Sequence, residues 1–210
     1  MPTPIEITNV ALGMIGEDPI NSFQNDLDTA RAANLRYPTV RDAILRDHFW
    51  NFAMARRQLA ALATPPDFGF ISQFQLPADF IRMFRVEPQD GDTISFRHEL
   101  HYQIEGGKLL ANIDPIRIKY VRREDDTTKW DAMATEALAA RLASELAISV
   151  TQSRELQDQL WRISLEKLAE ARSVDVLDEP ANIIEASSWT ESRFRAGGRH
   201  LDHRFHGNLF

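Results

Sequence analysis

Residues 48–60 read HFWNFAMARRQLA, and at this point the pattern of the chain changes. Four large side chains come within five positions, those of His48, Phe49, Trp50 and Phe52. Such a cluster suits three structures: a stacking platform for nucleic-acid bases, the wall of a substrate pocket, or the corner of a core where a helix leads into a sheet. The sequence on either side of the stretch favours the third.

Upstream of this stretch, apolar residues recur every three or four positions, which indicates two helices. The first, over residues 3–15, begins with a capping box of Thr3 and Glu6, and Gly16 suits its exit. The second helix, over residues 28–47, carries one inward stripe, which consists of Ala30, Ala33, Tyr37, Val40 and Ile44.

Downstream, over about residues 57–122, apolar and polar residues alternate in short runs, which is typical of strands. The runs HYQIE and KLLANI are joined by Gly106 and Gly107, and this pair predicts a tight hairpin. In the run IRIKYVR, positions 116, 118 and 120 are apolar or aromatic, whereas positions 117 and 119 are basic. We therefore expect one small antiparallel sheet with one face in solvent.

Two longer helices follow, over about residues 128–150 and 153–174, with Thr128 and Ser153 as their expected N-caps. The first of them is rich in alanine, so a neighbouring helix can approach it closely. The predicted fold class is α+β: a bundle of about four helices with a small antiparallel sheet inserted between the second and third, plus an extended C-terminal tail.

The composition changes near residue 180, so we expect one domain over residues 1–180 and a tail over residues 181–210. The tail combines arginines with spaced aromatic residues, the two kinds of side chain that are enriched at binding hot spots. A disordered end is the alternative, but a segment that orders against a partner accounts better for so many aromatics. The expected partner contacts are Trp189, Arg193, Phe194, Arg195, Arg199, Phe205 and Phe210.

The composition also limits the classes of function. With 210 residues and 43% hydrophobic content, the chain suits one domain with an appendage. The absence of cysteine excludes disulfides, thiolate zinc sites and cysteine nucleophiles. The net charge of −7 argues against a general affinity for DNA, and no apolar run is long enough to span a bilayer. The N-terminus lacks the basic start of a signal peptide, so we expect synthesis in the cytoplasm.

Residues that would carry chemistry are few. The sequence HELH at residues 98–101 spaces its histidines one residue too closely for the zinc-protease motif, and a strand there directs them to opposite faces. His200, His203 and His206 lie on a glycine-containing tail, which is a weak basis for a metal site. The acidic run at residues 124–126 is expected to be a solvated loop before a helix. We expect neither an enzyme nor a bound metal or cofactor.

The stretch from residue 11 to residue 53 resembles the N-terminal part of the tail tubular protein A family, the head-to-tail adaptor or gatekeeper proteins of short-tailed bacteriophages. Its last feature is Trp50-Asn51-Phe52-Ala53, at the end of the second expected helix. The earlier matching positions are Ala11, Leu12, Ile15, Gly16, Glu17, Pro19, Ile20, Ser22, Ala33, Asn34 and Tyr37. The order of the later elements is also similar, so the resemblance covers roughly residues 5–178 and leaves the tail out.

The resemblance implies a structural role for the opening stretch, because Trp-Asn-Phe-Ala is a structural signature of that family. Trp50 and Phe52 are then core anchors, and Ile15, Gly16 and Tyr37 are further core positions. It also implies a virion structural protein, assembled in the host cytoplasm, that forms a ring between the portal protein and the downstream nozzle protein of the tail. The ring would be dodecameric to match the portal, and genomic DNA would pass through it without specific binding.

A second hypothesis is a small helical DNA-binding regulatory protein that uses the arginines of the second expected helix. Arg31, Arg36, Arg41 and Arg46 step by five, so they wind around a helix and do not form one basic stripe. An enzyme that uses the histidines is the third hypothesis. Salt-dependent DNA affinity would favour the second hypothesis, and metal-dependent turnover the third.

Overall fold

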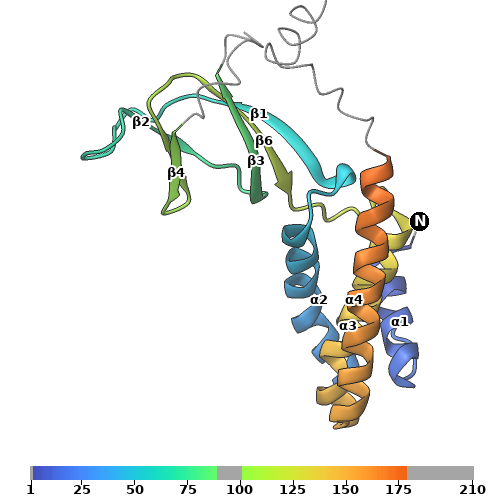
Figure 1. Ribbon diagram of the computed structural model, residues 1–210. Helices are drawn as coiled ribbons and strands as arrows, with labels where there is room; N and C mark the ends of the chain where they lie inside the picture. The colour runs from blue at the N-terminus through green and yellow to red at the C-terminus, as the bar shows by residue number, and fades with distance from the viewer. Residues whose placement is uncertain (1, 89–100, 179–210) are drawn as a thin grey trace, which may run out of the picture. The chain divides into compact units, whose positions relative to one another are not determined.

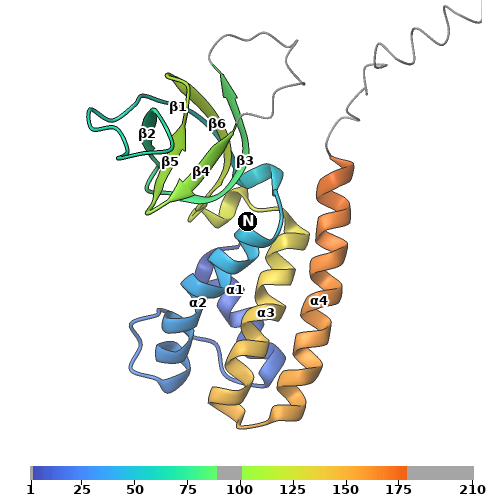
Figure 2. The same ribbon diagram turned by 60° about the vertical axis from the view of Figure 1, so that its left-hand side comes forward.

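The computed structural model describes residues 2–88 and 101–178 (Figures 1 and 2). Within these residues the chain forms four α-helices and two three-stranded antiparallel sheets, so the predicted α+β class is confirmed. The helices are α1 (Pro4–Ile15), α2 (Asp28–Asp47), α3 (Ala132–Thr151) and α4 (Arg154–Leu177). The described strands lie between α2 and α3 in the sequence, as expected. The boundary near residue 180 falls outside the described residues and stays a prediction.

Local hydrogen bonds fix the ends of the helices. The Thr3 hydroxyl accepts from the backbone N–H of Glu6 at 3.2 Å, and the Glu6 carboxylate accepts from the Thr3 N–H at 2.6 Å, so the predicted capping box is confirmed. Gly16 leaves α1 with a φ of +80°, a left-handed conformation that glycine adopts without steric cost. Ser153 caps α4, also as predicted.

The predicted cap of α3 is wrong. Thr128 lies in a short 3₁₀ turn, and its hydroxyl donates to the Asp126 carboxylate at 2.6 Å. The helix begins at Ala132, and its N-cap is Asp131, whose Oδ1 accepts from two free backbone N–H groups at 2.8 and 3.3 Å. An aspartate side chain is a strong cap because its oxygens only accept, whereas the threonine hydroxyl is engaged elsewhere.

Helix α3 is the centre of the bundle, because it packs against α1, α2 and α4. Most of its alanines are buried, and these small side chains let α4 lie along it (Figure 2). The predicted inward stripe of α2 is buried in full. In α4, Leu160 and Leu168 are buried, while Leu156 and Ile163 pack at the edge of the same core.

The strands form two sheets where the sequence predicted one (Figure 1). The first sheet has the order β1-β6-β3 and the second has the order β2-β5-β4. The strands are β1 (Met54–Leu59), β2 (Ser72–Gln75), β3 (Phe80–Pro88), β4 (Tyr102–Glu105), β5 (Lys108–Ala111) and β6 (Ile116–Arg122). Because β1 pairs with β6 from the far end of the insert, alternation along the chain does not reveal which strands share a sheet.

The predicted hairpin and the predicted alternation of β6 are both present. Gly106 and Gly107 join β4 to β5 with φ values of +55° and +75°, as a tight two-residue turn requires. Strand β6 buries Ile116, Ile118 and Tyr120 in a second core between the two sheets. The other buried members of this core are Leu59, Phe74, Leu76, Leu109 and Ala111.

The first sheet joins the bundle where α2 ends. Ile81 of β3 and Val121 of β6 belong to the helical core. The Arg46 guanidinium at the end of α2 donates to the Ile81 carbonyl at 2.7 Å, and Arg82 of β3 donates back to the Arg46 carbonyl at 3.1 Å. The stretch quoted at the outset therefore lies at the corner between the two cores.

Candidate functional site

The aromatic stretch forms a continuous series of ring contacts that we call the ring ladder: His48, Trp50, Phe52 and Trp130. Successive ring centroids lie 4.8, 5.7 and 5.0 Å apart. The two tryptophans are fully buried, and Phe52 is half-buried against the same core. The Trp50 indole N–H donates to the Ile44 carbonyl at 2.8 Å. These rings hold α2, the turn before β1 and the start of α3 together, which leaves them no free face for a base.

Asp175 of α4 binds this stretch from the other side. Its Oδ2 lies 3.0 Å from His48 Nε2, and its Oδ1 accepts from the Asn51 backbone N–H at 3.0 Å. The Asn51 side-chain amide donates to the Asp175 carbonyl at 2.8 Å. Asp175 is buried and is absent from the predicted residues. Its spacing in the sequence could have predicted its burial, because Asp175 continues the buried stripe of α4, which consists of Leu160, Ser164, Leu168, Ala171 and Asp175.

The acidic run at residues 124–126 is solvated at Asp125 and Asp126, as the sequence predicted, but the prediction is wrong for Glu124. Glu124 is buried, and its carboxylate forms ion pairs with Arg122 and with Lys129, the latter at 3.4 Å. Its backbone carbonyl accepts from the Trp130 indole at 3.1 Å. Glu124 therefore helps to fix the corner before α3, because its carboxylate and its carbonyl contact residues on both sides of that corner.

Tyr37 is buried within the helical core, and its ring centroid lies 5.6 Å from that of Phe23. Its hydroxyl has no hydrogen-bond partner among the described residues. Burial raises the pKa of Tyr37 to about 12, because the phenolate would lose its hydration there. Of the other core positions implied by the resemblance, Ile15 is buried and Gly16 forms the exit of α1.

The arginines of α2 are engaged in contacts within the chain. Arg31 pairs with Asp26 and Asp28, and Arg36 lies 3.7 Å from the Glu145 carboxylate of α3. Arg41 pairs with Asp42 and Asp125, and Arg46 donates to the carbonyl of β3 described above. Each guanidinium therefore serves an internal contact, and together they offer no basic stripe for a DNA backbone.

A basic surface that the sequence analysis did not single out lies on the first sheet. Strand register places Arg56 of β1 and Arg85 of β3 directly opposite Lys119 of β6, so three cations form one row across the sheet. Arg117, also of β6, lies in the next row on the same face. We call Arg56, Arg85, Arg117 and Lys119 the basic face.

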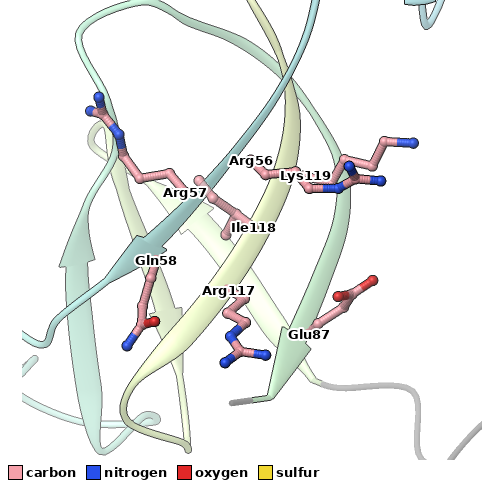
Figure 3. Close-up of a pocket in the computed structure, with 7 residues that line it drawn as sticks. All are labelled: Arg56, Arg57, Gln58, Glu87, Arg117, Ile118 and Lys119. Atoms are coloured by element: carbon pink, nitrogen blue, oxygen red, sulfur yellow. The ribbon is translucent and has the colours of Figure 1, made fainter. Parts of the chain in front are cut away.

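The side chains of β1 diverge at this surface. Figure 3 shows the head groups of Arg56 and Lys119 extending to the same side of the sheet, whereas Arg57 extends to the opposite side of β1. A hollow of about 200 Å³ lies here, between Arg56, Arg117 and Lys119 and the carboxylate-bearing Glu87 (Figure 3). The hollow is open and charged, so it fits a surface contact better than a buried small molecule.

Aromatic rings continue the basic face towards the bundle. The Lys119 ammonium lies 4.5 Å from the centroid of the Phe84 ring, and the Phe84 and Phe49 rings meet edge to face at 4.9 Å. The Arg82 guanidinium covers Phe49 at 4.1 Å. Phe49 thus belongs to the border of this surface, while Trp50, its neighbour in the sequence, belongs to the core.

The described residues offer few groups for chemistry. Within them, no group of three His, Asp or Glu side chains could hold a metal ion. His101, the one histidine of the HELH run in this part of the chain, stacks on Phe70 at 5.2 Å. The remaining residues of that run, the three tail histidines and the seven predicted partner contacts of the tail lie outside the described residues. None of the described helices is long and apolar enough to cross a membrane.

No protein-family model fits the chain, and no curated protein is significantly similar to it. What can be said of function therefore depends on the contacts above and on the resemblance of residues 11–53.

Proposed function

We propose that this protein is a structural component of a bacteriophage virion, a head-to-tail adaptor that forms a ring between the portal and the tail. Twelve copies would line the path through which the genome leaves the head. The portal protein would bind on one side and the nozzle protein of the tail on the other. The observation that carries the proposal is the Trp50-Asn51-Phe52-Ala53 segment, because it joins a helical bundle to a β insert in the order that the resemblance implies.

The contacts of the ring ladder support a structural role for this segment. Trp50 and Trp130 are fully buried with satisfied indole N–H groups, and Asp175 binds the segment to α4. These side chains fix the orientation of the β insert against the helices, which is what a subunit of a rigid ring requires.

The charge of the chain also supports the proposal. A conduit through which DNA slides must not bind phosphate tightly, and a chain with a net charge of −7 repels the DNA backbone. The alternative, a small DNA-binding regulatory protein, gains no support from α2, because its arginines contact carboxylates and a carbonyl of the same chain.

The experiment is to mix the purified protein with the portal protein of the same virus and to examine the mixture by electron microscopy. We expect a monomer or weak oligomer in isolation and a ring of subunits on the portal, because a heterologous contact repeated around an axis closes when a template sets the angle. Neighbouring genes give an independent check: a portal or capsid gene upstream and a large nozzle gene downstream are expected.

Two results would count against the adaptor. One is a stable, closed two-fold dimer in sedimentation, because such a dimer buries the same patch on both subunits and leaves no surface for ring growth. The other is the absence of any complex with the portal at concentrations where both proteins are folded.

A further inference from the structure

The basic face places like charges where a sheet ordinarily avoids them. Arg56, Lys119 and Arg85 lie directly opposite one another on three adjacent strands. Like charges at such positions destabilise a sheet, and neighbouring strands are only ~5 Å apart. The row therefore lowers the stability of the free subunit, and an anionic surface placed against it would remove that cost.

Little within the subunit neutralises this row. Arg85 lies 3.4 Å from Glu87, which is a contact between two exposed side chains. Among residues 2–88 and 101–178, Arg56, Arg117 and Lys119 form no ion pair. Lys119 rests over Phe84, whose ring is itself partly exposed. The basic face thus combines four cations, one carboxylate (Glu87, directly opposite Arg117) and an aromatic ring, in a chain that is acidic overall.

The outward face of α4 has the complementary character. Its buried side packs along α3, and on its outer side Trp161, Leu165 and Val176 are 37%, 47% and 57% exposed. Four exposed acids lie on the solvent side of the same helix, with the exposed Arg162 among them, so acids outnumber this cation four to one; we call the four acids the acidic face: Glu155, Asp158, Glu166 and Glu170. Among the described residues, none of the four forms an ion pair.

We propose that the basic face of one copy docks on the acidic face of α4 in a second copy of this chain. The two surfaces are complementary in net charge, and each carries an exposed apolar side chain, Phe84 on the sheet and Leu165 on the helix, beside a Trp161 ring that the Arg141 guanidinium covers at 3.6 Å. Because the two faces are different surfaces, the contact is head-to-tail and repeats from copy to copy. This inference rests on the proposed ring and names the surfaces through which its neighbouring subunits meet.

The contact is electrostatic in character, so it is weak in isolation and sensitive to salt. Charge complementarity contributes more to specificity and to the rate of encounter than to affinity. Exposed charges are screened beyond ~8 Å at physiological ionic strength, so added salt weakens the contact further. A contact of this kind keeps free subunits apart until the portal gathers them.

The decisive experiment uses reciprocal charge reversal in the full-length chain. One variant carries Arg56→Glu with Lys119→Glu, and the other carries Glu166→Lys with Glu170→Lys. Each alone is expected to weaken self-association in low-salt sedimentation by about 10- to 100-fold, because like charges then oppose each other across the contact. An equimolar mixture of the two is expected to associate again, because each variant then meets a partner of opposite charge.

Two controls separate this effect from misfolding and from net charge. Arg57→Glu makes the same reversal at one position, half the charge change of the double variant, on the opposite side of β1, and it is expected to leave association unchanged (Figure 3). The chain that carries all four reversals is expected to self-associate like the wild type, which a misfolded protein would not do. A zero-length carbodiimide cross-link from Lys119 to Glu166 or Glu170, between isotopically labelled and unlabelled copies, locates the contact directly.

The proposal is overturned if the mixture associates no better than either variant alone, or if no such intermolecular cross-link forms. It is also overturned if the Arg56→Glu, Lys119→Glu variant associates normally but loses binding to duplex DNA, since the basic face would then serve a nucleic acid. Failure here is distinct from failure of the adaptor function. Rings of either variant that form on the portal at wild-type level would reject these surfaces and leave the adaptor role in place.

Discussion

At the scale of single residues, the side chain on which most contacts converge is Trp50. Its indole is fully buried, donates to the Ile44 carbonyl at 2.8 Å, and packs between the His48 and Phe52 rings. Removing it leaves a cavity at the corner of two cores and an unsatisfied carbonyl. The cavity and the unsatisfied carbonyl both lie beside the end of α2, so the surrounding residues cannot easily move in to fill the cavity.

Trp50→Ala is expected to lower the free energy of unfolding by ~3–5 kcal/mol, as large-to-small substitutions in cores do. Trp50→Phe keeps a ring in the ladder and loses only the indole hydrogen bond, so a smaller loss is expected. Urea unfolding followed by circular dichroism measures both. An alanine variant as stable as the wild type would show that the ring is not part of the core.

Tyr37 gives the fold a dependence on alkaline pH. Its pKa is raised by burial to about 12 from 10.0, so the unfolded chain releases the phenolic proton first as pH rises. Stability from this group is present below pH 10 and is lost as pH rises to about 12, by roughly 2–3 kcal/mol in total. Tyr120 adds to the same loss, because burial and its hydrogen bond to Asp79 also raise its pKa.

Tyr37→Phe removes both the titrating group and a buried hydroxyl that has no partner among the described residues. We expect its stability at neutral pH to match or exceed that of the wild type by up to ~1 kcal/mol. We also expect its loss between neutral pH and pH 12 to be smaller. Thermal unfolding over this pH range tests the claim, and an unchanged alkaline loss in the variant would contradict it.

The sequence predicted the burial of residues that recur at helical or strand spacing. It missed residues whose role depends on contacts that only the folded chain forms. The stripe of α2 and the alternation of β6 follow from spacing alone. The buried Glu124 does not, because only the folded corner brings Arg122 and Lys129 around it. The basic face needed the register of β1, β6 and β3, which no local pattern contains.

At the scale of elements, the chain forms its helices and turns through short-range hydrogen bonds, and its sheets through long-range pairing. The caps Thr3, Asp131 and Ser153 each bind backbone groups within three residues, so sequence alone could rank the candidates. The choice at α3 failed because Thr128 and Asp131 both suit a cap, and the 3₁₀ turn that separates them has no distinct signature. The division into two sheets failed because β1 and β6 meet across the whole insert.

The two candidate caps of α3 can be told apart by substitution. Asp131→Ala is expected to lower the free energy of unfolding by ~1 kcal/mol, because two backbone N–H groups at the start of the helix lose their acceptor. Thr128→Ala is the matched control, and it is expected to change stability by less than ~0.5 kcal/mol because it removes one exposed hydrogen bond. Equal effects in urea unfolding would contradict the assignment of the cap.

At the scale of the whole molecule, two cores meet at one corner of the part of the chain that the structure describes. The helical core and the core between the sheets are both built from residues before the end of α4. The sequence predicted this order of elements. The tail beyond α4 carries aromatic and basic residues that no predicted core position requires.

The last prediction concerns residues 186–210, which lie in the tail beyond α4. Deleting residues 186–210 is expected to leave the thermal unfolding midpoint nearly unchanged, because the core residues that the structure describes all precede the deletion. The same deletion is expected to abolish incorporation into portal complexes. The lost segment can span ~80 Å when extended, enough to reach a neighbouring subunit or the side of the portal, and it carries the aromatic and arginine residues typical of hot spots. A segment that orders on binding couples attachment to assembly, because the docking groove exists only when the partner is present.

A full-length control with Trp189, Phe194, Phe205 and Phe210 changed to serine keeps the chain length and is expected to fail in the same way. Co-sedimentation with the portal measures both variants. Incorporation of the truncated chain at full affinity would reject the tail as the portal contact, and unfolding of the truncated chain would show that the tail belongs to the core.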